Sequence, residues 1–472
     1  MKKSKFSIKQ IKNKNTFFID KKYNFKIKYI EINYFVDYIY ISLNKYGINK
    51  KSKIILLIDN SFYLPLLYFT AIKYQITLMP LESLNNVKEL NIIKKKYKFD
   101  FILTDNIEIS KQLNSIKNRL FIDIKKNKIE LKKYYNLNKN NKTKKINFNS
   151  SFNFLCCLTS GTTGVKKYIY HSSNNLFNNA NNFLKFHNIR TRLNIYHTFS
   201  MSYMAGILNC IIIPFQSRGI VYFEERFNIT SSLNFLKLFN RSNSNTIWMA
   251  PFMLNLLNQL NYLNFQKINF EKKIKYLFCA TSQLDDETYK IFKNKFGITP
   301  IQTYGLSETL IISSNKINNQ YNNNGKSLTN VKIKLSKKKE ILVKSNSTFT
   351  QLKNDDYFKT GDIGKIDKNN NLLITGRLKE LIIKKGLNIS PYEIESLLIN
   401  KIKVPYVIFG SKDYIYGDKI CLGYINKRNI NSYLKKICEK NLPNKFIPDI
   451  YKKFDRFPYS NNGKIQRKLI KT

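Results

Sequence analysis

The sequence has few of the residues that build metal sites and disulfide frameworks. Its 472 residues include six cysteines, three histidines and one tryptophan. No two cysteines form a C-x-x-C pair and no histidine lies close to a cysteine in the sequence, so the spacing predicts neither a zinc site nor a disulfide framework. We expect reduced, buried thiols, which are typical of cytoplasmic proteins.

Acidic residues are also scarce. The chain has 31 Asp and Glu against 81 Lys and Arg, which gives a formal net charge of +50. Such a charge would indicate a polyanionic partner, but only ten of the basic residues are arginine, the side chain that binds phosphates and bases in bidentate geometry. Lysine is spread along the whole chain with asparagine, isoleucine, tyrosine and phenylalanine, which all have A/T-rich codons. We therefore attribute the charge to genomic base composition and predict no specific nucleic-acid partner.

Long uninterrupted hydrophobic runs are missing as well. The N-terminal stretch has a positive start, as a signal peptide has. It lacks the apolar segment that follows this start in a signal peptide. The most apolar window, residues 203–223, is interrupted by five polar or proline positions, which are Asn209, Pro214, Gln216, Ser217 and Arg218. This window predicts a buried element and no membrane span, so we expect a soluble, cytoplasmic protein.

The apolar residues that are present follow an alternating pattern. From about residue 50 to 125, short apolar runs alternate with longer amphipathic stretches, and further runs occur at 152–160 and 274–282. This alternation predicts an α/β fold with doubly wound sheets, and the length predicts two or more domains. The Lys/Asn-rich residues 125–150 predict a surface connection, the short runs of 325–375 predict small antiparallel strands, and residues 430–440 predict a helix.

Glycine is rare, and half of the 16 glycines fall in five segments that follow one another. These segments are "LTSGTTGVKK" (158–167), "TYGLSET" (303–309), "YFKTGDIG" (357–364), "GRLKELIIKKGLNISPYEIE" (376–395) and "PYSNNGKIQRKLI" (458–470). The first is a loop after a strand-like run, where backbone N–H groups and hydroxyls bind phosphates and lysine supplies positive charge. It is no Walker A loop, because the G-x-x-x-x-G-K-[ST] pattern is absent.

In these segments, which span roughly 151–472, the sequence resembles the acyl-adenylate-forming superfamily of acyl-CoA synthetases, peptide-synthesis adenylation domains and firefly luciferase. The resemblance implies ATP-dependent activation of a carboxylic acid to acyl-AMP, with release of pyrophosphate, followed by transfer to a thiol. It also implies a large N-terminal domain (1–376) of doubly wound α/β subdomains plus a small β-barrel-like part. A small mobile α+β lid (377–472) would turn at a hinge near Lys379.

The resemblance implies a role for individual residues. Lys464 would be the catalytic lysine between the carboxylate and the α-phosphate, where a fixed ammonium stabilises developing charge. Glu308 would hold Mg²⁺ together with Thr163, because this hard cation prefers oxygen ligands. Asp362 would accept the ribose hydroxyls, and Arg377 would lie beside it. The ATP/AMP-binding residues implied are Thr159, Ser160, Gly161, Thr162, Thr163, Gly164, Lys167, Tyr304, Gly305, Ser307, Asp362 and Arg377.

The acyl and thiol sites are implied in the same way. Tyr203, Ala280 and Thr281 would line the acyl pocket, with Tyr203 as an aromatic gate and His197 as a structural histidine. Gly386 would line the tunnel for the thiol arm, because a residue without a side chain leaves room for it. The acceptor would be CoA or the phosphopantetheine of a separate carrier protein, and the resemblance does not choose between them.

One residue departs from the family pattern. Tyr168 stands where the phosphate loop normally ends in glycine, so we expect Tyr168 to adopt a backbone that glycine usually supplies. An inactive relative therefore remains an alternative, and so does a basic nucleic-acid-binding protein on a ligase fold. The second alternative predicts the loss of Lys464, Glu308 or Asp362, and all three are present.

Overall fold

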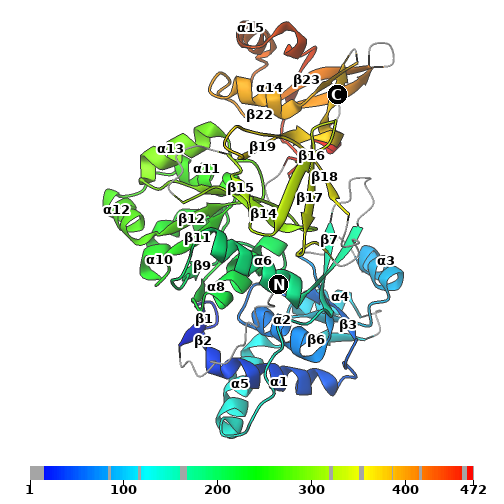
Figure 1. Ribbon diagram of the computed structural model, residues 1–472, viewed down its shortest axis with the longest axis vertical. Coiled ribbons are helices and arrows are strands. Elements are labelled where there is room, and N and C mark those ends of the chain that lie inside the picture. Colours follow the sequence, from blue (N-terminus) through cyan, green and yellow to red (C-terminus); the bar gives the residue numbers. More distant parts are fainter. Residues whose placement is uncertain are drawn as a thin grey trace.

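The computed structural model describes residues 15–82, 87–114, 118–159, 167–317, 323–349, 356–384, 386–413, 417–459 and 465–470. Two mixed α/β sheets, a small antiparallel sheet and a C-terminal sheet follow one another in space (Figure 1). Within the described ranges, no helix is both long and apolar enough to cross a bilayer. The predicted α/β class is confirmed.

The largest sheet has nine strands with a parallel centre. In spatial order they are β15 (Lys326–Ser327), β14 (Leu310–Ser314), β13 (Ile301–Leu306), β12 (Tyr276–Cys279), β11 (Thr246–Met249), β9 (Ile195–Tyr196), β10 (Val221–Phe223), β1 (Thr16–Asp20) and β2 (Phe25–Lys28). Strand β9 lies between β10 and β11, so the strand order reverses there, as in a doubly wound sheet.

The second sheet has six strands. Neighbouring strands in it are parallel, except for the antiparallel pair of β7 and β8. They are β6 (Arg119–Phe121), β5 (Phe101–Thr104), β3 (Lys53–Leu57), β4 (Thr77–Pro80), β7 (Asn153–Thr159) and β8 (Lys167–Ser172). Strand order reverses at β3, between β4 and β5. The strands are apolar and almost fully buried, as the sequence pattern predicts for parallel sheets covered on both faces.

The small sheet and the C-terminal sheet complete the fold. The small sheet contains β16 (Val331–Leu335), β17 (Glu340–Ser345), β18 (Phe358–Ile366) and β19 (Leu372–Arg377), all antiparallel. It occupies the place of the expected barrel-like part. The C-terminal sheet contains β21 (Leu387–Ile389), β20 (Ile382–Lys384), β23 (Gly417–Ile425) and β22 (Tyr406–Asp413), and β24 (Ile450–Phe454) pairs with β23.

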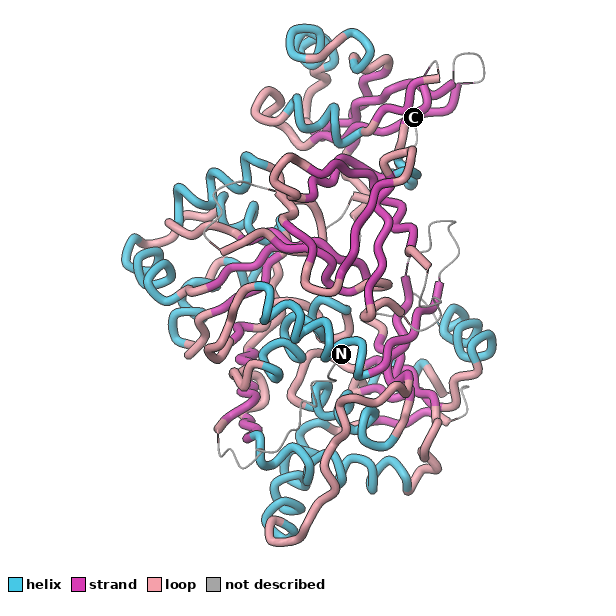
Figure 2. The backbone as a smooth tube through the Cα atoms, in the orientation of Figure 1, coloured by secondary structure: helices cyan, strands magenta, loops and turns pink. Residues whose placement is uncertain are grey.

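Helices cover the sheets, as the tube view in Figure 2 shows. They are α1 (Ile32–Asn44), α2 (Tyr63–Tyr74), α3 (Val87–Tyr97), α4 (Ile107–Gln112), α5 (Ile124–Asn138), α6 (Ser173–Phe186), α7 (Met204–Ile207), α8 (Ile213–Gln216), α9 (Ile229–Ser232), α10 (Phe235–Arg241), α11 (Pro251–Gln259), α12 (Asn264–Lys273), α13 (Asp286–Phe296), α14 (Pro391–Leu398) and α15 (Asn431–Asn441). Single turns add η1 (Tyr29–Glu31), η2 (Leu208–Ile212), η3 (Leu378–Glu380), η4 (Asn444–Phe446) and η5 (Arg467–Leu469).

Helix α5 contradicts the prediction of a surface connection over residues 125–150. Asp123 caps this helix by accepting a hydrogen bond from the Lys126 N–H. Ile124 and Leu131, two turns apart, are buried, and the Lys132 ammonium pairs with Glu31 at 2.7 Å. A narrow apolar stripe therefore suffices to hold a lysine-rich helix against α1, because packing of one face outweighs the polar composition of the rest.

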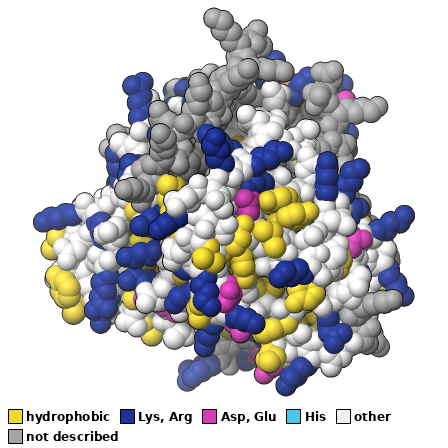
Figure 3. Space-filling view, turned by 90° about the horizontal axis from the view of Figure 1, so that it is seen from below, with side chains coloured by type: hydrophobic (Ala, Val, Ile, Leu, Met, Phe, Trp, Pro, Cys, Tyr) yellow, Lys and Arg dark blue, Asp and Glu magenta, His cyan; other side chains and the backbone are white. Residues whose placement is uncertain are grey.

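The basic residues do not collect on the face shown in Figure 3. Lysine and arginine side chains are scattered there among apolar and neutral ones. A protein that reads nucleic acid usually concentrates its basic residues in a stripe or patch. The visible face agrees with the interpretation that the charge reflects base composition.

Candidate functional site

Three of the predicted nucleotide-binding residues are in direct contact. The Tyr304 hydroxyl, at the end of β13, donates a hydrogen bond to Asp362 Oδ2 at 2.7 Å. The Arg377 Nε donates to Asp362 Oδ1 at 2.6 Å, and Asp362 pairs with Arg377 across β18 and β19. Asp362 is 4% exposed, whereas the Arg377 side chain is 50% exposed. The cluster therefore joins the nine-stranded sheet to the small sheet and leaves the guanidinium accessible.

The backbone before Asp362 is held by local contacts. Gly361 has φ = +74°, which favours glycine, and its N–H donates to Glu340 Oε1 at 3.0 Å. The Thr360 hydroxyl donates to the Ile341 carbonyl and accepts from the Asp362 N–H. The "KTGD" segment is thus fixed by its neighbours on β17 before any ligand binds.

The turn after β13 carries the predicted metal-binding carboxylate. Gly305 is required here by close approach, because an added Cβ would lie 2.4 Å from the Leu310 carbonyl oxygen of β14. The Glu308 carbonyl accepts a hydrogen bond from the Phe349 N–H at 2.8 Å, which holds the turn. The half-buried Glu308 carboxylate has no hydrogen bond or ion pair within the described ranges, in a chain with 81 basic residues.

This donor set fits a magnesium ion shared with phosphates. No group of three His, Cys, Asp or Glu residues that could hold a metal occurs in the described part of the chain. Mg²⁺ commonly binds through one or two carboxylates plus substrate phosphates and water, so a full protein cage is not needed. Glu308 would be the carboxylate ligand, and Thr163 lies outside the described residues.

A histidine that the sequence did not single out supports the same turn. His171, at the end of β8, donates from Nε2 to the Ser307 carbonyl oxygen at 2.7 Å. His171 is fully buried, and burial lowers its pKa to about 4, so the ring is neutral at pH 7. It links the strand after the phosphate loop to the residue before Glu308.

All three histidines should make the fold sensitive to acid. Burial lowers the pKa of His171 to about 4 and that of His187 and His197 to about 3, from 6.5. Each ring stays neutral in the fold while the unfolded chain takes up a proton, so stability present above pH 6.5 is lost as the pH falls toward 4. Between pH 6.5 and 5 we expect a loss of about 2 kcal/mol per histidine in the free energy of unfolding.

Urea unfolding at pH 7.5, 6.5, 5.8 and 5 measures this loss. Buried carboxyls such as Asp20 and Asp105 have raised pKa values, mainly through burial, and they act in the opposite direction. Their folded-state pKa lies above the unfolded value near 4, so their stabilising effect begins as the pH falls through the raised value and is complete below about pH 4. A midpoint that stays constant from pH 6.5 to 5 would contradict the assignment of neutral, buried rings.

Tyr203, the predicted gate, lies close enough to the cluster for its charges to act on it. Burial is the largest cause that raises its pKa to about 12, and the charges of Glu82 and Glu308 raise it further. The positive charge of Arg377 acts in the opposite direction. His197, which competes with Tyr203 for the gate role, is fully buried.

The residues predicted to line the acyl pocket lie at the end of β12. The buried Ala280 donates its N–H to the Met249 carbonyl, and Thr281 has φ = +80°, a rare conformation for a β-branched residue. The Thr281 hydroxyl is buried without a hydrogen-bond partner in the described structure, and so are both amide atoms of Gln302. Gln302 pairs with Cys279, two residues before Thr281, so unsatisfied polar groups gather at this strand end.

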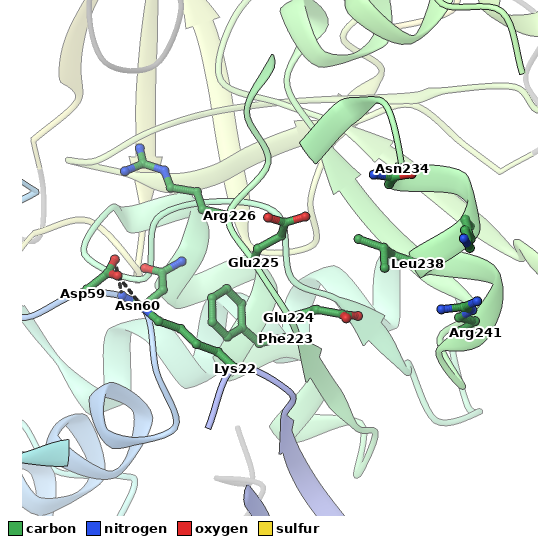
Figure 4. Close-up of a pocket in the computed structure, with 11 residues that line it drawn as sticks. Lys22, Asp59, Asn60, Phe223, Glu224, Glu225, Arg226, Asn234, Leu238 and Arg241 are labelled. Atoms are coloured by element: carbon green, nitrogen blue, oxygen red, sulfur yellow. Dashed lines mark hydrogen bonds and ion pairs between the residues drawn. The ribbon is translucent and has the colours of Figure 1, made fainter. Parts of the chain in front are cut away.

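A cavity of about 650 Å³ opens beside these elements but does not include them. Figure 4 shows its walls: Asp59 and Asn60 after β3, Glu225 and Arg226 after β10, and residues of α10. Asn60 donates to the Phe199 carbonyl and accepts from the Met201 N–H, so it joins the carboxyl ends of β3 and β9. None of the predicted nucleotide or acyl residues lines this cavity.

The carboxyl ends of the two large sheets therefore face each other. Besides the Asn60 contacts, Arg226 after β10 pairs with Glu82 after β4 at 2.9 Å. In open α/β sheets, ligands bind outside the carboxyl ends of the strands where the strand order reverses. Tyr203 follows β9 at this reversal, between the two sheets.

The phosphate-loop residues 160–166 lie outside the described residues, which leaves Ser160, Gly161, Thr162, Thr163 and Gly164 without a structural account. The backbones of Thr159 and Lys167 pair across β7 and β8. Tyr168 pairs with Leu158 in a regular strand, without a positive φ, and its ring contacts Tyr97 of α3. The expectation that Tyr168 needs a glycine-like backbone is wrong, because β8 already begins at Lys167.

The predicted hinge residue lies between the small sheet and the C-terminal sheet, and the predicted tunnel residue lies between β20 and β21 of the C-terminal sheet. Lys379 is the middle residue of η3, which directly follows β19. Gly386 has φ = +75°, and no atom of the described residues lies within 4 Å of an added Cβ, so these residues leave the space beside it open. Lys464 lies outside the described residues, next to Ile465.

Polar residues that hold the site together were missed by sequence reasoning. His171, Asn60 and Arg467 each bind backbone or side chains more than 50 residues away in the chain. No local pattern marks the first two. Arg467 stood in a quoted segment, and its place three residues after Lys464 was the available signal.

The chain was compared with known protein families and proteins. The family model "AMP-binding enzyme" matches residues 10–347. The 2-succinylbenzoate–CoA ligase of Staphylococcus epidermidis is 27% identical over 337 residues, which cover 66% of this chain and 68% of that protein.

Solved structures share the fold over nearly the whole chain. The ATP-bound MatB protein of Rhodopseudomonas palustris is 18% identical with a TM-score of 0.84, over 98% of this chain and 96% of that one. The o-succinylbenzoate CoA synthetase of Bacillus subtilis, in complex with its acyl-adenylate intermediate, is 19% identical with a TM-score of 0.79, over 96% and 94%. At these identities the likeness shows the fold.

Proposed function

Because the chain belongs to the AMP-binding enzyme family, we propose that it activates a carboxylic acid with ATP as acyl-AMP and transfers the acyl group to CoA. The family predicted from the five glycine-containing segments is confirmed, and with it the enzyme type, an AMP-forming acid–thiol ligase. The roles of individual residues, the acid and the acceptor are parts of the proposal.

The contact of Tyr304 and Arg377 with Asp362 carries the proposal. A carboxylate offers about four acceptor positions, and these two donors use one on each oxygen, which leaves two for a pair of ribose hydroxyls. The Tyr304 ring, the accessible Arg377 guanidinium and the Glu308 carboxylate, which has no partner among the described residues, would then serve adenine, phosphate and a phosphate-bound cation.

Positioning and charge stabilisation supply the chemistry. The acid's carboxylate attacks the α-phosphorus, the bond to pyrophosphate breaks, and negative charge on the phosphate oxygens grows. Lys464 is proposed to hold the carboxylate and α-phosphate oxygens together, and Glu308 to hold Mg²⁺, which neutralises phosphate charge when it is bound. His171 keeps the Ser307–Glu308 turn in place.

Thiol transfer is proposed to need a second position of the C-terminal sheet. Residues 377–472 would rotate about Lys379 as a lid on residues 1–376, which brings Gly386 toward the acyl-adenylate. The open space beside Gly386 suits a narrow thiol arm. CoA is the proposed acceptor because the relative from Staphylococcus epidermidis is a CoA ligase.

We propose 2-succinylbenzoate as the acid to test first. A relative and a solved structure carry this acid in their names. The unsatisfied Thr281 hydroxyl and Gln302 amide would accept an acid with polar groups besides the reacting carboxylate, since buried polar atoms need partners. A purely aliphatic acid would leave them unpaired.

Acid-dependent exchange of labelled pyrophosphate into ATP tests the function. The panel is 2-succinylbenzoate, 3-benzoylpropionate, which lacks the ring carboxylate, benzoate, which lacks the succinyl arm, and hexanoate. We expect exchange with 2-succinylbenzoate and at least 10-fold less with each truncated acid, because one lost charged hydrogen bond costs about 1.5–3 kcal/mol. Product analysis with CoA and with a phosphopantetheine carrier protein then identifies the acceptor.

Three outcomes would contradict the proposal at different levels. Exchange with hexanoate alone would retain the ligase and overturn the polar acid. ATP binding by calorimetry without exchange for any acid, including a wider panel of carboxylates, would indicate the inactive relative. Transfer to the carrier protein but not to CoA would replace the acceptor only.

A further inference from the structure

Arg467 connects four separate segments of the C-terminal part of the chain. Its Nη2 donates to Glu395 Oε2 of α14 at 2.5 Å, its Nη1 to Glu380 Oε2 of η3 at 3.1 Å, and its Nε to the Ile408 carbonyl of β22 at 3.1 Å. All three nitrogens of the guanidinium are therefore used. The side chains of this "Arg467 network" are 21% exposed for Arg467, 19% for Glu395 and 30% for Glu380.

Each partner of the network is itself fixed. The second oxygen of Glu395 accepts the Ile408 N–H at 2.9 Å. Glu380 is the last residue of η3 and directly follows Lys379, the proposed hinge. Burial raises the pKa of Glu395, and the neighbouring charge of Arg467 acts in the opposite direction.

Arg467 also follows a short stretch of chain that is paired with residues 458 and 459. Tyr459 and Ile465 form an antiparallel bridge, and the Gln466 N–H donates to the Pro458 carbonyl at 2.8 Å. These contacts join the two chain segments on either side of residues 460–464. Ile470, after η5, is buried with Val407 and Phe409 of β22. Residues 465–470 are thus held by their own apolar contacts, and Arg467 adds the connection to η3.

We infer that Arg467 is a positioning residue, which couples the segment that carries Lys464 to the hinge turn at Glu380. The inference rests on the proposed function, because it assigns the adenylation step to Lys464. When η3 changes its backbone angles, the guanidinium makes residues 465–467 follow Glu380 and α14 as one body. Lys464, one residue before Ile465, then reaches the α-phosphate in a defined position.

Only arginine can make these contacts together. Its planar guanidinium presents donors in fixed directions toward two carboxylates and a carbonyl, whereas a lysine ammonium is a single point charge on a flexible stem. The chain has ten arginines among 81 basic residues, so an arginine at this place is not explained by composition.

The two half-reactions separate positioning from general stability. We expect Arg467→Ala to lower acid-dependent pyrophosphate exchange by about 10²-fold and thioester formation from supplied acyl-adenylate by less than threefold. Glu380→Gln, which removes the charge at the hinge and keeps the α14 contact, should lower exchange by about 10-fold. Arg467→Lys should restore part of the exchange lost in Arg467→Ala, with the acid's KM little changed and kcat reduced.

Lys412→Ala is the matched control. Lys412 is 84% exposed and pairs with Asp418 at 2.9 Å on the same sheet. We expect both half-reactions to stay within twofold. Equal losses of both half-reactions in Arg467→Ala, or full activity in it, would overturn the inference.

Hydrogen exchange tests whether Arg467 holds its own segment in place, and this measurement needs no turnover. In Arg467→Ala, amides of residues 456–470 should exchange at least 10-fold faster than in the native protein, while those of β22, β23 and α15 keep their rates. Faster exchange throughout the C-terminal sheet would show a fold-stabilising role and contradict positioning. If the native protein shows no turnover with any acid, the proposed function fails, and this measurement still decides whether Arg467 holds the segment.

Discussion

The Asp362→Ala variant is expected to lose at least 10²-fold in kcat/KM for ATP, chiefly through a higher KM. The alanine removes the carboxylate that we propose as the acceptor for both ribose hydroxyls. Two hydrogen bonds to a charged group are worth about 3 kcal/mol or more, and every 1.4 kcal/mol is a factor of ten. Pyrophosphate exchange against ATP concentration measures the loss, and calorimetry with ATP checks that binding is the step affected.

Nucleotide analogues make the Asp362 result specific. The native protein should discriminate ATP from 2′,3′-dideoxy-ATP by about 10²-fold. Asp362→Ala should bind the two nucleotides almost equally, because the loss of the carboxylate and the loss of the ribose hydroxyls remove the same hydrogen bonds. Such a cycle isolates one pairwise interaction from general damage to the site. Equal discrimination in both proteins would show that Asp362 does not contact the ribose.

Tyr304→Phe is the matched control for Asp362. It keeps the ring that we expect against adenine and removes only the hydroxyl that donates to Asp362 at 2.7 Å. Arg377 still holds the other carboxylate oxygen. We therefore expect less than a 10-fold rise in the KM for ATP, and a loss as large as that of Asp362→Ala would mean that the hydroxyl itself binds the nucleotide.

Replacement of Lys464 by alanine is expected to lower acid-dependent pyrophosphate exchange by about 10³-fold. Removal of one group that stabilises transition-state charge costs about 10²–10³-fold, and here the group is also proposed to orient the attacking carboxylate. ATP binding should change little, because Asp362, Tyr304 and Glu308 remain. The expected signature is a fall in kcat with almost unchanged KM for ATP.

The second half-reaction provides the internal control for Lys464. Thioester formation from supplied acyl-adenylate and CoA should stay within threefold of the native rate, because the thiol attacks the acyl carbon and AMP leaves as the acyl C–O bond breaks, so no bond to the α-phosphorus forms or breaks. Lys436→Ala, at an exposed lysine of α15, should leave both half-reactions intact. Parallel losses of both half-reactions in Lys464→Ala would contradict its assignment to adenylation.

The local elements of the fold were predictable from the sequence, because burial of strands and helices leaves periodic patterns. The apolar runs at 152–160 and 274–282 became β7 and β12, and the amphipathic run at 430–440 became α15. The same reasoning failed for α5. Its apolar stripe is so narrow that the helical periodicity is hidden among the many lysines. It also failed at Tyr168, where the strand begins earlier than the family pattern implies.

The contacts that assemble the site were not predictable in this way. Asn60 binds the backbone of Phe199, 139 residues away, and His171 binds that of Ser307, 136 residues away. Asparagine is abundant in this chain, and nothing local distinguishes Asn60 from its solvated neighbours. Whether such a polar group is buried and paired depends on which sheet edges face each other, and this is a property of the packed structure.

The sequence by itself determined the family and the type of chemistry, because the residues proposed to bind ATP stand in short contiguous segments whose glycines and charges are recognisable without a fold. It also determined the α/β class, because parallel strands must be apolar along their whole length. Only the tertiary structure decided how those segments meet. Asp362 gains its partner Tyr304 from a strand 58 residues earlier, and Arg467 reaches back 87 residues to Glu380. Buried charges need partners, and the packing of distant elements decides which ones are within reach.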